Sequence, residues 1–130
     1  MITNALRRQQ MAKSISPLSW DAAVSQAVPF RSAADAWFWT MGALRARREN
    51  SGRGSSGVRR PCDPDDVVLC LDRLYRAAKI DLRHARILRI WGERQMAPDG
   101  RHLAERDEAQ VWDEALARLE WSLRVKGIVA

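Results

Sequence analysis

The chain has 130 residues, which is long enough for one domain with a hydrophobic core. Its formal net charge is +6. It has only two cysteines and no apolar leader ahead of them, which argues against a secreted, disulfide-stapled scaffold. No apolar run approaches the ~20 residues that cross a bilayer. We therefore expect a single-domain cytoplasmic protein that does not enter the membrane.

Helical patterns follow one another along the chain, and no segment shows the alternation of apolar and polar residues that is typical of a β-strand. Asp63-Pro64 is the strongest helix start, because aspartate caps the free amide groups and proline suits the first turn, while Ser32 and Asp81 are further N-cap candidates. The segments expected to be helical are residues 3–13, 20–27, 33–49, 64–78, 82–95 and 103–126. This pattern predicts an all-α bundle of four to six helices.

The last three of these helices should form the best-defined core. Apolar side chains recur at helical spacing in each of them, which gives each helix one apolar face. We expect the residues in mutual contact to be Leu71, Leu74, Leu88, Trp91, Trp112, Leu116 and Leu119.

Residues 45–60 (RARRENSGRGSSGVRR) are the strongest sequence clue to function. The segment combines glycine and serine with arginines and has Glu49 as its single acid, so we expect a flexible, cationic loop. Such a loop can bind a polyanion through its arginines, which are Arg45, Arg47, Arg48, Arg53, Arg59 and Arg60.

A second basic surface is expected on the helix at 82–95. Arg83, Arg86 and Arg89 lie on the side opposite its apolar residues Leu88 and Trp91. This helix therefore has one face that can be buried and one that carries arginines, and a further helix precedes and follows it. Such an arrangement is typical of a helix-turn-helix DNA-binding protein. Solvated arginine faces are also common on ordinary helices, and that interpretation stays open.

Six tryptophans are many for this length, and helical geometry separates them. Trp37 and Trp39 lie about 200° apart around one helix, with Phe38 between them, so that helix is apolar nearly all round. Trp121 lies opposite Trp112 on the last helix. Trp37, Phe38, Trp39 and Trp121 are therefore candidates for contact with a protein partner or a second copy, and packing within the chain is the alternative.

Catalysis, metal binding and cofactor binding are not expected. Cys62, Cys70, His84 and His102 are the residues that could ligate a metal, and they lie in separate elements without paired spacing. The glycines at 52–57 follow no strand and precede no GK[ST], so they are not a phosphate-binding loop.

The runs SAADAWFWTMGALRARRE, PCDPDDVVLCLDRLYRAAKIDLRHARILRIWGERQMAPD and ALARLEWSLRVKGIVA resemble an uncharacterised family of short bacterial proteins found around mobile genetic elements. That resemblance implies no activity, ligand or site residue. Residues 80–94 followed by 112–123 are also loosely similar to the DNA-reading end of sigma-like regulators. This second likeness implies a helix-turn-helix, although residues 96–105 contain a proline and glycine turn where such regulators place a short helix.

Two function hypotheses follow from the sequence. In the first, the protein is a small, non-catalytic DNA-associated regulator or accessory protein, with phosphate contacts from the 45–60 loop and docking by Arg83, Arg86 and Arg89. In the second, it is a protein-interaction module that uses its tryptophan-bearing helix faces, with another protein or a second copy of the chain as the candidate partner.

Overall fold

The computed structural model describes residues 27–50 and 58–130. These residues contain four α-helices, α3 (Ala33–Arg48), α4 (Pro64–Arg76), α5 (Leu82–Arg94) and α6 (Arg106–Val125), with a short 3-10 helix, η1 (Leu103–Glu105), just before α6. The predicted all-α fold is confirmed, and the starts of α3, α4 and α5 agree with the sequence signals. The expected helix at 3–13 and all but the last residue of the one at 20–27 lie outside the described residues.

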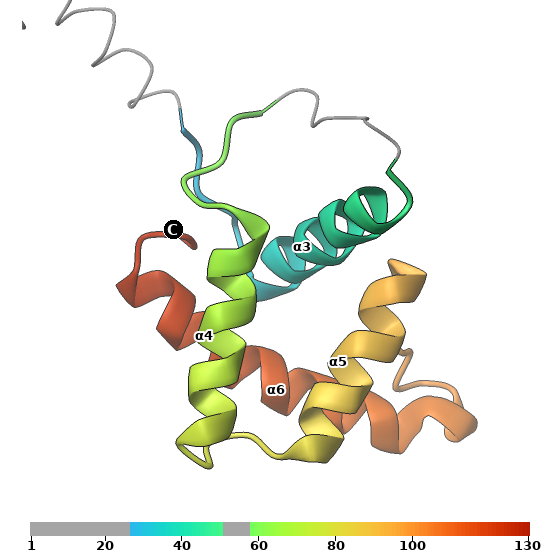
Figure 1. The fold of residues 1–130 in the computed structure, drawn as a ribbon. Helices are drawn as coiled ribbons and strands as arrows, with labels where there is room; N and C mark the ends of the chain where they lie inside the picture. Colours follow the sequence, from blue (N-terminus) through green and yellow to red (C-terminus); the bar gives the residue numbers. More distant parts are fainter. Residues whose placement is uncertain (1–26, 51–57) are drawn as a thin grey trace, which may run out of the picture.

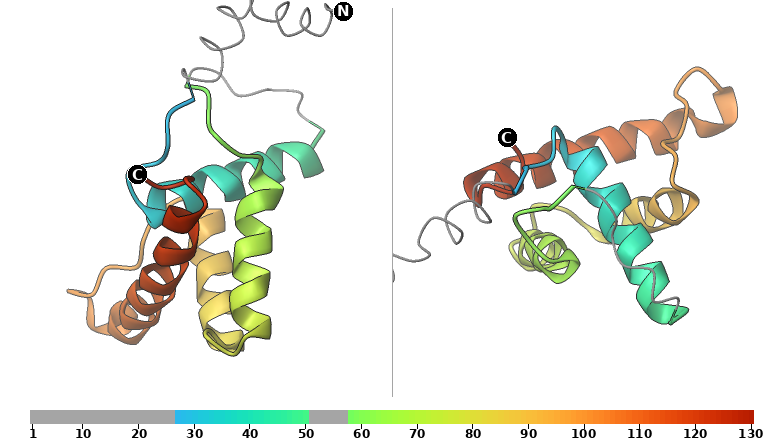
Figure 2. Two further views of the ribbon diagram at one scale, coloured as in Figure 1. Left: turned by 90° about the vertical axis from the view of Figure 1, so that its left-hand side faces the viewer. Right: turned by 90° about the horizontal axis from the view of Figure 1, so that it is seen from above.

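The four helices enclose one core (Figure 1). α5 packs against α6 and α3, and α4 packs against α3 and α6, whereas α4 and α5 touch least. Figure 2 shows α6 along one side of the described bundle, with the other three helices on its inner side. The side chains buried most completely include Val67, Leu88, Leu119 and Leu123.

The expected core is confirmed in its centre and looser at its edge. Leu88, Trp91, Trp112 and Leu119 are buried, as their helical spacing predicts. Leu71, Leu74 and Leu116 are half-buried and pack around this centre.

The segment after α6 also belongs to the core, which the sequence did not indicate. Ile128 and Val129 are buried, and Val129 forms an isolated parallel bridge with Phe30, at the other end of the described chain. The Phe30 amide donates to Ile128 O at 2.9 Å, and the Ala130 amide donates to Phe30 O at 2.9 Å. The residues before α3 and after α6 therefore hold each other in place.

The connections between the helices do not match a helix-turn-helix closely. Residues 95–105 join α5 to α6 and include η1, whereas the turn of that motif has about three or four residues. The helix-turn-helix-like arrangement of the last three helices remains a prediction.

Candidate nucleic-acid interface

α5 is held firmly by its neighbours at several points along its length. At its start, the Asp81 carboxylate accepts from the His84 amide at 3.1 Å, while His84 Nδ1 accepts from the Asp81 amide at 3.0 Å. The other ring nitrogen, His84 Nε2, lies 3.2 Å from Glu114 Oε1 of α6, within hydrogen-bond distance. The side chains on the outer face of α5 therefore project from a helix whose start is held in place by hydrogen bonds.

Two indole hydrogen bonds hold the rest of the helix. Trp37 Nε1 of α3 donates to Leu88 O at 2.8 Å, and Trp91 Nε1 donates to the Glu108 carboxylate of α6 at 2.8 Å. Both bonds involve buried indoles, which need a partner for their N–H group.

The outer face of α5 carries three exposed arginines, Arg83, Arg86 and Arg89, which we call the α5 arginine face. They are spaced i, i+3, i+6, and over the described residues no carboxylate oxygen lies within 4.0 Å of their charged nitrogens. Glu93, the acid of α5, lies instead 4.0 Å from Arg48 of α3. Half-buried Ile90 lies on the same side of the helix. This face is therefore positively charged and has no acidic partner in the described structure.

Arg94 differs from these three. Its guanidinium carbon lies 4.5 Å from the centre of the Trp91 ring, a cation–π arrangement that holds it against the protein.

The expectation of a flexible loop from Arg45 onward is wrong at its start. Arg45, Arg47 and Arg48 belong to the last turn of α3, where positive charge is favourable because the helix dipole places negative charge at that end. Arg45 donates to Glu93 O at 2.6 Å, and Arg47 pairs with Asp65 of α4 at 3.2 Å. These arginines connect α3 to its neighbours and remain largely exposed.

The other arginines of the 45–60 segment divide into three cases. Arg60 is half-buried: it donates to Val28 O at 3.1 Å, and its guanidinium carbon lies 4.2 Å from the centre of the Phe30 ring. Arg59 is exposed, and Arg53 lies outside the described residues. Arg60 is thus a structural residue that the sequence did not distinguish from its neighbours.

Three of the four proposed interface aromatics are used within the chain. Trp37 is buried against α5, so its assignment to an external interface is wrong. Phe38 and Trp39 are half-buried, with ring centres 5.5 Å from Trp112 and 5.1 Å from Phe30. The apolar character of α3 on nearly all sides reflects its central position, which was the alternative considered from the sequence.

Trp121 is the interface candidate that is left on the surface. Trp121 is 69% exposed to solvent, and Val125, one turn later on α6, is 66% exposed. Sequence analysis missed Val125 as part of this surface, although its i, i+4 spacing from Trp121 could have indicated it.

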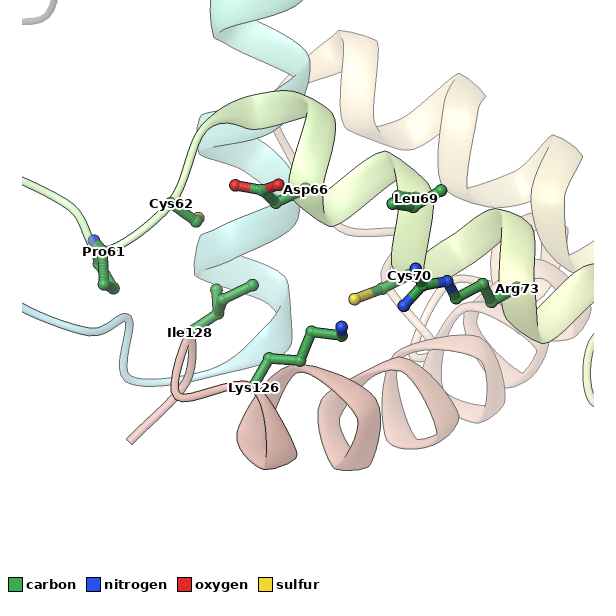
Figure 3. Close-up of a pocket in the computed structure, with 8 residues that line it drawn as sticks. All are labelled: Pro61, Cys62, Asp66, Leu69, Cys70, Arg73, Lys126 and Ile128. Carbon is green, nitrogen blue, oxygen red and sulfur yellow. The ribbon is translucent and has the colours of Figure 1, made fainter.

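A small pocket lies between α4 and the end of α6 (Figure 3). It has a volume of about 150 Å³ and is lined by Pro61, Cys62, Asp66, Leu69, Cys70, Arg73, Lys126 and Ile128. Pockets for organic ligands usually measure about 300–1,000 Å³. This pocket therefore has room for a few water molecules or one small ligand, and it is smaller than the usual site of a drug-sized substrate or cofactor.

The thiol of Cys62, at the edge of this pocket, has low reactivity. Burial, followed by the charges of Asp66 and Asp63, raises the pKa of the thiol to about 11. At neutral pH the group is a thiol and not the thiolate that attacks electrophiles or binds metals. Within residues 27–50 and 58–130, no three His, Cys, Asp or Glu side chains gather as metal ligands would.

No helix in the described parts of the chain is both long and apolar enough to cross a membrane. Comparisons of the chain with known protein families, with curated proteins and with solved structures found no match.

Proposed function

We propose that this protein is a non-catalytic nucleic-acid-binding accessory or regulatory protein that contacts phosphates through the α5 arginine face. The observation that supports this most strongly is the absence of a carboxylate within 4.0 Å of Arg83, Arg86 and Arg89 among the described residues, although other arginines are paired. Guanidinium groups without a carboxylate partner, carried on a helix held in place, are suited to form bidentate hydrogen bonds with phosphate, because the group is planar and carries several N–H donors.

The geometry of the face fits a polyanion. Six residues of helix separate Arg83 from Arg89, a rise of about 9 Å. Duplex DNA carries one negative charge per ~1.7 Å of its axis, so this stretch of helix can approach several phosphates at once. Ile90 adds an apolar contact on the same side of the helix.

The arginines at the end of α3 can add to this surface from a second element. Arg45 and Arg48 both reach Glu93 of α5, so the carboxy end of α3 lies beside the carboxy end of α5. In this proposal the α5 arginine face is the main contact, and Arg45, Arg47, Arg48 and Arg59 are further phosphate contacts.

The test is a titration of fluorescently labelled duplex and single-stranded oligonucleotides at several salt concentrations. Each arginine that contacts a phosphate contributes ~0.9 to the slope of log affinity against log salt for duplex DNA. The triple variant Arg83→Gln, Arg86→Gln, Arg89→Gln should therefore bind more weakly and lower the slope by up to ~2.7. Circular dichroism should show that its helices are intact, because all three side chains are exposed.

The matched control is Arg76→Gln, Arg101→Gln, Arg106→Gln, which removes the same charge from exposed positions on other elements. It should keep most of the wild-type slope. Equal loss in both triple variants would show a non-specific charge effect and contradict the α5 site. Absence of binding by the wild-type protein to any strand at low salt would overturn nucleic-acid binding altogether.

A further inference from the structure

We infer that the small pocket between α4 and the end of α6 binds a doubly charged oxyanion between Arg73 and Lys126, either a free phosphate ion or the phosphate group of a small ester. The pocket has a volume of about 150 Å³, and both residues line it. This inference is independent of nucleic-acid binding, because neither residue belongs to the α5 arginine face.

Two positively charged side chains from different helices meet at one end of this pocket. Arg73 lies in the last turn of α4, and Lys126 directly follows α6. Figure 3 shows their charged ends pointing toward each other, beside the sulfur atom of Cys70. Both side chains are exposed, so an ion from the solvent can reach them.

No acidic group of the described chain neutralises this pair of charges. Between residues 27–50 and 58–130, no carboxylate oxygen lies within 4.0 Å of the charged nitrogens of Arg73 or Lys126, whereas Arg76, one turn along α4, pairs with Asp72 at 3.0 Å. Because two cations that share a site repel each other, an anion bound between Arg73 and Lys126 is favoured.

The acid of the pocket, Asp66, is engaged elsewhere. Its Oδ2 atom accepts a hydrogen bond from the Asp63 amide at 2.8 Å, at the start of α4. Figure 3 shows the Asp66 carboxylate on the side of Cys62, turned away from Arg73 and Lys126. The pocket therefore has one acidic end and one basic end, and the basic end is where an anion fits.

The size and charge of the site favour phosphate. One water molecule takes up about 30 Å³ of liquid, so an ion a few times larger than water fits the pocket, whereas ligands that need the usual ~300–1,000 Å³ do not. A phosphate monoester carries about −1.5 to −2 charges at pH 7, which matches two cations, whereas a simple carboxylate carries one.

The donors around the site also suit an oxyanion. The Arg73 guanidinium can donate to two oxygen atoms at once, and the Lys126 ammonium adds a second positive charge. Cys70, which is 1% exposed, places a weak S–H donor on the buried side of the pocket.

The test is a titration of the full-length chain with sodium phosphate, followed by amide NMR spectra, with sodium chloride used to keep the ionic strength constant. The amide signals of Cys70, Arg73 and Gly127 should shift in a saturable manner. We expect a Kd on the order of 1 mM, from two or three charge-assisted hydrogen bonds. Acetate, with its single charge, should bind about tenfold more weakly.

Single variants locate the site. Arg73→Gln and Lys126→Gln should each raise the Kd for phosphate by about tenfold. Arg76→Gln is the matched control, since it removes the same charge from α4 but its guanidinium pairs with Asp72 outside the pocket. This control should leave the Kd unchanged.

A parallel titration with glycerol phosphate distinguishes the two sources of the anion. Binding as tight as that of phosphate assigns the site to a small ester, and exclusion of glycerol phosphate assigns it to the free ion. Absence of saturable shifts with phosphate, or an equal loss in Arg76→Gln, overturns the proposal. Arg73 and Lys126 would then serve only the helix ends, where the dipole favours positive charge. Acetate binding as tight as that of phosphate would overturn the match to a doubly charged ion.

Discussion

The indole of Trp37 lies directly over Gly92, so that a Cβ atom built on the glycine would be 2.5 Å from Trp37 Nε1. The same Cβ atom would be 2.8 Å from Met41 Cγ. Because Trp37 is held by its hydrogen bond to Leu88 O, the indole cannot move aside without losing a buried bond. α3 and α5 can pack this closely only because residue 92 has no side chain.

We therefore expect Gly92→Ala to destabilise the protein by roughly 1–3 kcal/mol, in the range of overpacked cores. Gly42→Ala is the matched control, since its Cβ atom would meet only Gln95 Nε2 at 3.8 Å. That change should stabilise α3 by about 0.5–1 kcal/mol, because alanine favours the helix over glycine. Urea unfolding curves of both variants measure the two effects. If the two variants changed the free energy of unfolding equally, a side chain at residue 92 would fit beside Trp37 and the proposed crowding would be wrong.

The two tryptophans of α6 should differ sharply in their contribution to stability. Trp112 is 3% exposed, so Trp112→Ala should cost roughly 3–5 kcal/mol. Trp121→Ala should change stability by less than ~0.5 kcal/mol at low protein concentration, because the side chain is largely exposed. Thermal unfolding at low concentration measures both. A similar loss in the two variants would contradict the outward position of Trp121.

Cys62 should react slowly with alkylating agents while the protein is folded. Since its pKa is raised from 9.0 to about 11, the folded protein should contain roughly a hundredfold less Cys62 thiolate at pH 8 than the unfolded chain. Iodoacetamide labelling followed by peptide mass spectrometry measures the rate at this cysteine in both states. A folded-state rate as fast as that of the unfolded chain would contradict the burial of the thiol.

The same pKa has a consequence for stability at high pH. The protonated thiol is favoured in the folded protein, so its contribution is complete below pH 9.0 and is lost as the pH rises toward about 11. The urea midpoint of the wild type should fall over this interval relative to that of Cys62→Ser, which has no thiol to ionise.

At low pH the start of α5 should weaken. The His84 amide, as the main cause, lowers the pKa of Asp81 below its ordinary value of 3.8. The ionised carboxylate therefore stabilises the fold above pH 3.8, and that contribution is lost as the pH falls through the lower folded-state value. The urea midpoints of wild type and Asp81→Asn should converge as the solution is acidified. A constant difference between them at every pH would show that the Asp81 charge does not support the helix.

The helices were predictable because their signals are local. Ser32, Asp63 and Asp81 precede their helices, and the apolar spacing within each helix shows which side is buried. The direction of Trp37 was not predictable, because it depends on the space above Gly92 in another helix. The same holds for the bridge between Phe30 and Val129, whose partners are almost at opposite ends of the described chain.

The candidate site was predictable only in part for a similar reason. Arg45 and Arg60 look like the other arginines of their segment, yet they donate to backbone carbonyls of Glu93 and Val28. Every residue has a carbonyl group, so sequence composition cannot identify such a partner. Arg83, Arg86 and Arg89 were easier to place, because opposite sides of one helix follow directly from residue spacing.

The bridge between Phe30 and Val129 also bears on the order in which this protein can fold during synthesis. Phe30 is made early, whereas Ile128 and Val129, which pair with it, are made about a hundred residues later, and domains complete folding only when their contacts are available. Until residue 129 has been made, Phe30 has Trp39 and Arg60 as neighbours but lacks this last part of its cover. Any interruption of synthesis before that point releases a chain whose core is open at this end.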